Sequence, residues 1–175
     1  IAAGRTLAFF EALFGTGAAI VRAMPNTPAA VRRGITVCVA RGATGAERAL
    51  CQDLLEAVGE VAWVEDEGLM DAVTAVSGSG PAYVFLLAEC LAQAGVRAGL
   101  PADLASRLAR ATVAGAGELL HQSPDEAGQL RHNVTSPGGT TAAALALLMD
   151  EAKGLGPMMD AAIAAATARS RELAG

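Results

Sequence analysis

Asn-Val-Thr-Ser-Pro-Gly-Gly-Thr-Thr, residues 133–141, runs directly into the apolar segment Ala142–Met149. Pro137 and the two glycines after it prevent a helix from beginning earlier, and they let the backbone approach a ligand closely. The two threonines that follow favour the N-cap position of a helix. The stretch therefore predicts a loop that ends in the N-terminus of a helix.

A helix N-terminus of this kind can hold an anion. Its first amides have no partner inside the helix, and they lie at the positive end of the helix dipole. Side-chain hydroxyls of the loop would converge on the same carboxylate or phosphate. They belong to Thr135, Ser136, Thr140 and Thr141. An ordinary loop before a well-capped helix has the same composition, so the residues alone leave both interpretations open.

The composition indicates a globular protein built largely from helices. Of the 175 residues, 53% are hydrophobic and 18% are charged, so we expect a large buried core. Aromatic residues make up only 3%, and a core of Ala, Leu and Val suits closely packed helices better than a β-sandwich. The net charge of −5 and the lack of a basic tract argue against a nucleic-acid partner.

Cysteines and histidines are too few and too scattered for a disulfide framework or a metal site. Cys38, Cys51 and Cys90 are widely spaced in apolar sequence, which favours a reducing, cytoplasmic location. His121 and His132 are the only histidines, too few for a histidine zinc site or a Ser-His-Asp triad. We therefore predict that no metal is bound.

Neither a membrane span nor a secretory signal is expected. The longest apolar run, Ala82–Ala88, is too short to cross a bilayer, and Glu89 interrupts its continuation. The first five residues carry no secretory pattern. They also lack a methionine, so we expect the sequence to begin inside a longer protein.

Residues 1–66 alternate between strand and helix patterns. Strands are expected at residues 1–3, 20–23, 35–40 and 61–64. Thr6 and Thr44 are expected to cap the helices between them. This order resembles the second half of a Rossmann-like, doubly wound nucleotide-binding sheet, so we predict an α/β remnant as the first domain. The G-x-G-x-x-G loop that would bind a pyrophosphate is absent from the sequence.

Two prolines stiffen the segment Met24–Pro28, which is Met-Pro-Asn-Thr-Pro. They predict an extended loop after a strand, without ladder hydrogen bonds. Ligands of open α/β sheets bind at the carboxyl ends of strands, which makes Asn26 and Thr27 candidate polar contacts. A plain proline-stiffened turn is the alternative.

From Glu67 onward the pattern is helical only, so residues 67–175 form the second predicted domain. We expect Ser77–Gly80 to break the first helix there and Pro81 to begin the next, which runs to about Ala94. Further helices are expected to begin near Pro101, Pro124, Thr140 and Pro157. The helix after Pro81 is apolar on nearly every face, which predicts that a second subunit covers it; a central helix of a monomeric bundle is the alternative.

Three segments, read together, resemble those of the pyrroline-5-carboxylate reductases. They are Met-Pro-Asn-Thr-Pro at 24–28, Asp-Ala-Val-Thr-Ala-Val-Ser-Gly-Ser-Gly-Pro-Ala-Tyr at 71–83 and Val-Thr-Ser-Pro-Gly-Gly-Thr-Thr at 134–141. The resemblance implies a dinucleotide-binding domain followed by a helical domain that interlocks into a homodimer, often assembled into decamers. It also implies reduction of 1-pyrroline-5-carboxylate to L-proline with NADPH or NADH, the last step of proline biosynthesis.

The resemblance also assigns site residues. It implies that Ser136 and the amides of Gly139 and Thr140 hold the substrate carboxylate, and that the Thr141 hydroxyl acts as the catalytic group near the ring nitrogen. Glu67 matches a position that contacts substrate. The implied cofactor-binding positions are Ile1, Ala2, Ala3, Asn26 and Asn133.

Two other functions remain open from the sequence. One is a non-catalytic helical dimerisation module whose glycine loop binds an anion. The other is a related reductase that acts on a different small imino or keto acid. The sequence departs from the family pattern in lacking the first half of the nucleotide-binding domain, which leaves cofactor binding by this chain in doubt.

Overall fold

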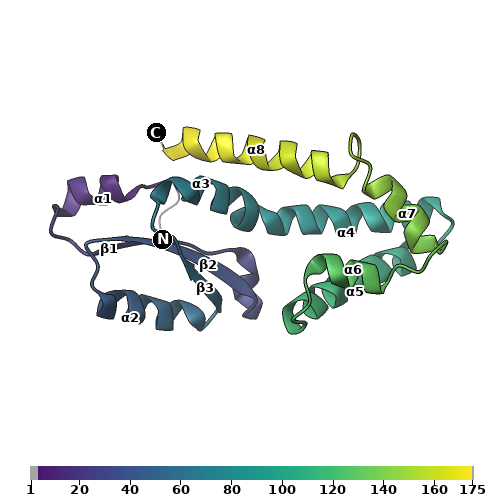
Figure 1. Ribbon diagram of the computed structural model, residues 1–175, viewed down its shortest axis with the longest axis horizontal. Helices are drawn as coiled ribbons and strands as arrows, with labels where there is room; N and C mark the ends of the chain where they lie inside the picture. The colour runs from purple at the N-terminus through teal and green to yellow at the C-terminus, as the bar shows by residue number, and fades with distance from the viewer. Residues whose placement is uncertain (1–3, 175) are drawn as a thin grey trace. The chain divides into compact units, whose positions relative to one another are not determined.

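The computed structural model describes residues 4–174 (Figure 1). In chain order the elements are α1 (Leu7–Phe14), β1 (Ile20–Met24), η1 (Thr27–Val31), β2 (Gly34–Arg41), α2 (Gly45–Glu56), β3 (Gly59–Trp63), η2 (Glu67–Leu69), α3 (Met70–Val73), η3 (Thr74–Gly78), α4 (Gly80–Arg97), α5 (Ala102–Gln122), α6 (Ala127–Asn133), α7 (Thr140–Leu148) and α8 (Leu155–Ala174). The expected α/β region followed by helices is confirmed. The predicted strand at residues 1–3 lies outside the described residues.

The chain forms two compact units, and each is described by itself. Unit 1 comprises residues 1–81 and 161–175, and unit 2 comprises residues 82–160. The chain passes from one unit to the other within α4 and again within α8. The predicted domain division between residues 66 and 67 stays a prediction.

Unit 1 contains a three-stranded sheet in the order β1-β2-β3. The strands β2 and β3 are parallel and are joined by α2, which is the predicted strand-helix-strand unit. The strand β1 is antiparallel to β2, with Met24 opposite Val37. The loop after Met24 therefore lies at the end of the sheet where β2 begins. Ligands of open α/β sheets bind at the carboxyl ends of the parallel strands, and the carboxyl ends of β2 and β3 lie at the opposite end of the sheet from this loop.

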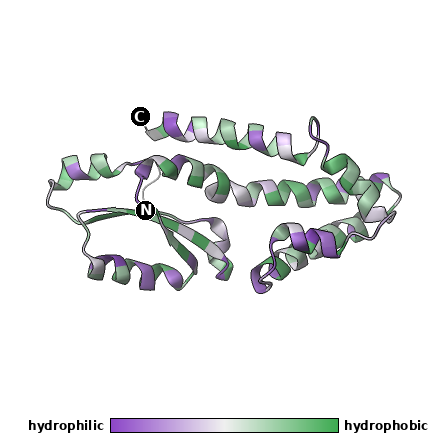
Figure 2. Cartoon of the chain, viewed as in Figure 1, coloured by the Kyte–Doolittle hydropathy of each residue, from purple (hydrophilic) through white to green (hydrophobic). Residues whose placement is uncertain are grey.

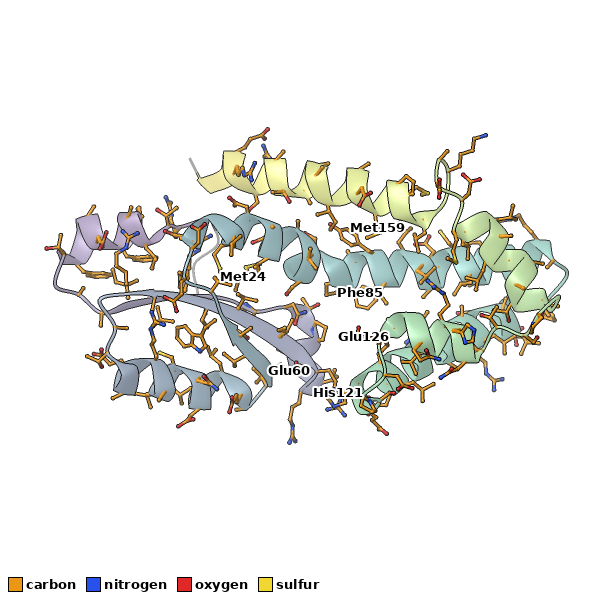
Figure 3. All side chains as sticks on the ribbon, viewed as in Figure 1. Met24, Glu60, Phe85, His121, Glu126 and Met159 are labelled. Atoms are coloured by element: carbon orange, nitrogen blue, oxygen red, sulfur yellow. The ribbon has the colours of Figure 1, made fainter. Side chains whose placement is uncertain are left out.

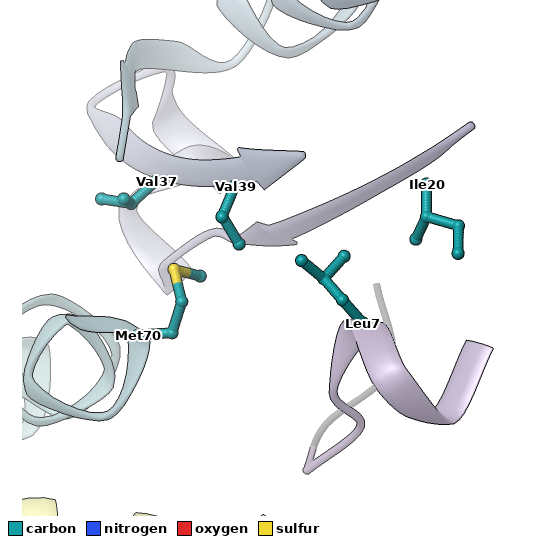
Figure 4. Packing of buried hydrophobic residues seen from close by; sticks show 5 residues of the cluster. All are labelled: Leu7, Ile20, Val37, Val39 and Met70. Atoms are coloured by element: carbon teal, nitrogen blue, oxygen red, sulfur yellow. The ribbon is translucent and has the colours of Figure 1, made fainter. Parts of the chain in front are cut away.

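The core of unit 1 lies where α1 and α3 cover one face of the sheet (Figure 4). Its buried members are Leu7, Ile20, Val37, Val39 and Met70. The central strand β2 is buried on both faces, because Thr36 and Cys38 alternate with Val37 and Val39 and are also buried. Burial raises the pKa of the Cys38 thiol to about 11, so this thiol stays protonated near neutral pH.

The predicted N-caps of unit 1 are confirmed. The Thr6 side chain accepts a hydrogen bond from the Phe9 amide at the start of α1. Thr44 forms a reciprocal capping box with Glu47 at the start of α2, in which each side chain accepts from the other residue's amide. Local polar side chains thus determine where both helices begin.

The predicted break at Ser77–Gly80 is wrong. The chain stays helical from Glu67 to Arg97, and it passes through a π-helical turn at Thr74–Gly78 in which the Ser79 amide donates to the Thr74 carbonyl at 2.9 Å. Pro81 has no amide to donate to the Ser77 carbonyl, and its ring would collide with that carbonyl in a regular α-helix. The wider turn accommodates the proline without ending the helix.

The predicted extended loop at 24–28 is also wrong beyond Asn26. A 3₁₀ helix begins at Thr27, and Pro28 lies in its first turn. The fixed φ of proline is compatible with the start of a helix, where the missing amide costs nothing. The other helix starts differ less from expectation: Pro101 is the N-cap of α5, α6 begins after Glu126, and Pro157 lies in the first turn of α8.

Unit 2 buries very little apolar surface by itself. Its only buried hydrophobic residues among those described are Ala105 and Ala109, both on α5. Hydrophobic residues follow α4 along most of its length (Figure 2), and Phe85 projects from it (Figure 3) with an exposed fraction of 68%. Among the described residues, unit 2 therefore does not contribute to the large core expected from composition, because most of its large apolar side chains lie on the surface of the single chain.

The helical segment Glu67–Arg97 is longer than the apolar run suggested. By length and composition alone, these 31 residues would be enough to cross a membrane. The core helix of a soluble protein satisfies the same criteria, so the pattern by itself does not distinguish a bilayer from a protein partner.

Candidate functional site

The N-terminus of α7 is free of any side-chain cap. Gly139 is the N-cap residue, with φ −78° and ψ 173°, and no side chain bonds to the first turn. The prediction that Thr140 and Thr141 cap the helix is wrong, because they are its first two residues. Their hydroxyls are consequently not used in capping, and the amides of Thr140, Thr141 and Ala142 have no partner inside the helix.

A tight turn precedes this helix end. The Gly139 amide donates to the Ser136 carbonyl at 3.1 Å, and Gly138 has a left-handed φ of 68°. The left-handed φ favours glycine at position 138, and a Cβ at position 139 would displace the Ser136 hydroxyl. The turn brings the Ser136 hydroxyl beside the first turn of α7, and it leaves Thr140 rather than Gly139 as the first free amide.

The side chains of Asn133 and Thr135, which precede the turn, form hydrogen bonds with residues of α6. The Thr135 hydroxyl donates to the Arg131 carbonyl at 2.6 Å, which satisfies the end of that helix and removes this hydroxyl from the predicted set. The Asn133 side-chain oxygen accepts from Gln129 at 2.7 Å and leaves its amide NH₂ exposed to solvent. Of the predicted residues in unit 2, the structure thus gathers Ser136, Gly139, Thr140 and Thr141 at one helix end, with Asn133 just upstream.

Two predicted site residues of unit 1, Glu67 and Asn26, form hydrogen bonds with residues of the sheet. The Glu67 carboxylate oxygen Oε1 accepts from the Leu7 amide at 2.8 Å and from the Arg22 guanidinium at 2.7 Å. The Asn26 side-chain oxygen accepts from the Ile35 amide at 3.0 Å, which holds the loop after β1 to β2. The predicted cofactor positions Ile1, Ala2 and Ala3 lie outside the described residues.

The sequence analysis missed the hydroxyl of Ser77. It lies in the π-helical turn, is shielded from solvent, and has no hydrogen-bond partner among the described residues. The next residue, Gly78, lies against the end of the Met24 side chain, whose position Figure 3 labels. Because a buried polar atom without a partner is unusual in a folded protein, Ser77 marks a place where a water or a ligand group is expected.

Cavities occur in both units. One of about 540 Å³ is lined by residues 18–23, which lead into and form most of β1, together with Arg5, Phe10 and Phe14. Another of about 550 Å³ lies between α4 and α5, with Phe85 and Arg110 in its lining. Within residues 4–174 no cluster of three His, Cys, Asp or Glu side chains is placed to hold a metal ion.

The protein thus consists of a small α/β unit and a helical unit. The helical unit exposes apolar side chains, and its helix α7 begins without a side-chain cap. Residues 67–173 match the family described as pyrroline-5-carboxylate reductase dimerisation. The chain belongs to the pyrroline-5-carboxylate reductase family.

Relatives with curated names agree with this assignment. The chain is 45% identical over 177 residues to a pyrroline-5-carboxylate reductase of Pseudomonas aeruginosa, and the match covers 99% of this chain and 63% of the relative. It is 47% identical to one of Pisum sativum, with 87% of this chain and 55% of the relative covered. The chain thus spans less than two thirds of the length of these relatives.

Solved structures show the same fold. A pyrroline-5-carboxylate reductase of Coxiella burnetii matches with a TM-score of 0.94 at 39% identity, over 100% of this chain and 64% of that one. The Plasmodium falciparum pyrroline carboxylate reductase, solved with NADP bound, matches with a TM-score of 0.83 at 32% identity, over 99% of this chain and 65% of that one. The helical part of the present chain is therefore a dimerisation domain, which supports self-association.

Proposed function

We propose that the complete protein reduces 1-pyrroline-5-carboxylate to L-proline, with NADPH or NADH as the hydride donor. The observation that carries this proposal is the N-terminus of α7, which has no side-chain cap, and where amides and hydroxyls lie beside a tight turn through Gly138 and Gly139. The names of the relatives support the substrate and the reaction, and the NADP-bound relative supports the cofactor.

The substrate carboxylate would bind at the first turn of α7. The Ser136 hydroxyl and the Thr140 amide donate to it, and the helix dipole adds a favourable field. No basic side chain lies between Asn133 and Thr141. The site therefore holds the anion by oriented dipoles, which keeps excess positive charge away from the imine.

Thr141 has the catalytic role in this proposal. Its hydroxyl orients the ring nitrogen or passes a proton to it as the imine carbon accepts hydride, and the bound cofactor supplies that hydride. Glu67 contacts the substrate, and Asn26 and Asn133 contact the cofactor. Their present hydrogen bonds leave capacity for this, since one oxygen of Glu67 and the NH₂ groups of both asparagines have no partner among the described residues.

The complete protein is proposed to work as a homodimer in the cytoplasm, with further assembly to a decamer and without a nucleic-acid or membrane partner. The exposed apolar surface of α4 supports association, and the net charge of −5 offers no patch for nucleic acid. The apolar helix Glu67–Arg97 belongs to the dimerisation match, so a second subunit accounts for it without a bilayer.

The test is a substrate panel. The complete protein would be incubated with NADPH or NADH and with pyrroline-5-carboxylate, other cyclic imino acids and short keto acids, and cofactor oxidation would be followed at 340 nm, the absorbance of reduced nicotinamide. We expect rapid oxidation with pyrroline-5-carboxylate only. Faster oxidation with another acid would favour the related-reductase alternative, and no oxidation with any acid would favour the non-catalytic module.

A further inference from the structure

We propose that Arg22 and the first amide of α1 are positioning groups for Glu67, and that they hold its carboxylate so that the oxygen Oε2 accepts a hydrogen bond from a ligand N–H. This inference rests on the proposed function, in which Glu67 contacts the substrate; the N–H in question is that of an iminium form of the substrate or of the secondary ammonium product. It adds a residue, Arg22, that neither the sequence pattern nor the resemblance singles out.

Three separate segments meet at this carboxylate. Glu67 is the first residue of η2, Arg22 lies in the middle of β1, and Leu7 is the first residue of α1. The Arg22 guanidinium lies 2.7 Å and the Leu7 amide 2.8 Å from the same oxygen, Oε1. Both donors therefore fix one oxygen and leave the other without a partner among the described residues.

The environment makes this arrangement rigid. The side chains of Arg22 and Glu67 are exposed by only 16% and 21%, so solvent screens the pair less than it screens a surface pair. Leu7 is buried in the core of unit 1, which fixes its amide in space. The amide also lies at the N-terminus of α1, where the helix dipole favours a carboxylate. A Glu67 carboxylate held in this orientation is suited to accept a hydrogen bond from a cationic N–H such as an iminium or a secondary ammonium.

Other ion pairs of unit 1 lack these features. Arg41 pairs with Glu11 across α1 and β2, but the Arg41 side chain is 47% exposed and no backbone amide joins the pair. Arg48 pairs with Glu65, whose side chain is 79% exposed. The pair of Arg41 and Glu11 therefore serves as a matched control, since it joins the same two layers without reaching a predicted site residue.

The contact of Arg22 also predicts which substitution is tolerated. Only one guanidinium nitrogen reaches Glu67, so the pair is not the two-pronged kind that only arginine can form. A lysine keeps the charge and one donor. We therefore expect Arg22→Lys to keep most of the function that Arg22→Gln loses.

The experiment uses the complete enzyme. It measures kcat and KM for pyrroline-5-carboxylate at saturating NADPH, and KM for NADPH in a separate series at saturating pyrroline-5-carboxylate. Variants are Glu67→Gln, Arg22→Gln, Arg22→Lys, Arg41→Gln and the double variant of Glu67→Gln with Arg22→Gln. We expect Glu67→Gln and Arg22→Gln each to raise KM for the substrate on the order of tenfold, the effect of one hydrogen bond to a charged group. The double variant should be no worse than Glu67→Gln, because Arg22 acts through Glu67.

Several outcomes would overturn the inference. The first is a KM for the substrate in the double variant that is raised by the product of the two single effects. The second is an Arg41→Gln enzyme whose KM rises as much as that of Arg22→Gln, and the third is an Arg22→Lys enzyme whose KM is no lower than that of Arg22→Gln. The fourth is an Arg22→Gln enzyme with the parental KM while the KM of Glu67→Gln is raised. In that last case the proposed role of Glu67 stands and only the positioning role of Arg22 falls. Parental kinetics in Glu67→Gln itself would instead remove the proposed substrate contact. If Arg22→Gln does not fold, the comparison of Arg22→Lys with Arg41→Gln decides.

Discussion

The hydroxyl of Thr141 is the residue on which the proposed chemistry depends most. It occupies the second position of α7 and takes no part in capping, so its removal should leave the fold intact. In the complete enzyme we expect Thr141→Ala to lower kcat by roughly a hundredfold, the usual contribution of a positioned proton-transfer group. Steady-state kinetics and a thermal unfolding curve of the same sample measure the two effects separately.

Thr141→Ser is the matched control for this prediction. It keeps the hydroxyl and removes only a methyl group, so much of the activity should remain. An alanine variant that turns over at the parental rate would show that the hydroxyl has no chemical role.

Ser77 gives a second prediction at the residue scale. Its buried hydroxyl has no hydrogen-bond partner within residues 4–174, and an unsatisfied polar atom costs stability. We expect Ser77→Ala to raise the free energy of unfolding by roughly 1 kcal/mol. The control is Thr74→Val, which removes a hydroxyl that donates to the Met70 carbonyl at 2.8 Å and should destabilise instead.

The two outcomes for Ser77 have different meanings. A gain in stability with parental activity would identify a tolerated defect of the π-helical turn. A gain in stability with lower activity in the complete enzyme would indicate that a ligand uses the hydroxyl. A loss of stability would contradict the assignment of Ser77 as unpartnered.

At the scale of elements, helix starts could be predicted because their determinants are local. Thr6 and Thr44 each bond to an amide three residues away, and the sequence shows that spacing directly. A prediction follows for α2: Thr44→Ala should lower the free energy of unfolding by about 1 kcal/mol, whereas Thr44→Ser should be nearly neutral. Urea unfolding of the two variants measures the difference, and equal midpoints would contradict the role of the cap.

The errors at the element scale come from proline. The sequence predicted that Ser77–Gly80 breaks the helix before Pro81 and that Pro25 and Pro28 hold an extended loop. In the structure Pro81 follows a π-helical turn and Pro28 lies in the first turn of η1, positions where a missing amide is tolerated. Proline therefore marks a helix start as readily as a helix end, and its presence in the sequence does not distinguish the two.

The candidate site was predictable only in part for the same reason. The glycine loop and the helix after it are contiguous, so the resemblance and the propensities located them together. The bonds of Glu67 to Leu7 and Arg22 join residues that are 60 and 45 positions apart. Nothing in the spacing of these residues along the chain indicates such a contact, and it became visible only with the sheet in place.

At the scale of the whole molecule, the apolar surface of unit 2 predicts an obligate dimer. Phe85 and Leu86 of α4 are exposed by 68% and 57%, while only two alanines of this unit are buried among the described residues. A unit without a core of its own is stable only when a partner covers it. Sedimentation at micromolar concentration should show no folded monomer, and a monomer that keeps its helical signal on dilution would contradict this.

A charge at Phe85 sharpens the dimer prediction. Phe85→Glu should disrupt the dimer and with it the helical signal, because the substitution would place a carboxylate in a dry interface. The matched control is Leu54→Glu on α2, since Leu54 is exposed by the same 68% in the single chain. We expect this control to remain dimeric, and an equal loss in both variants would mean that α4 is not the interface.

The last prediction concerns the 175-residue chain tested alone. A dinucleotide is held chiefly by a glycine-rich turn and the helix N-terminus after it, and the sequence contains no G-x-G-x-x-G. Within the described sheet, β1 pairs only with β2, so its other edge has no strand partner among the described residues. An unpaired edge lowers local stability, so residues up to about 66 should exchange their amide hydrogens faster than the helices from about residue 67 onward. We therefore expect this chain to dimerise but to bind NADPH weakly or not at all. Calorimetric titration with NADPH measures the affinity, and micromolar binding together with proline formation by the isolated chain would show that its own residues suffice for the cofactor.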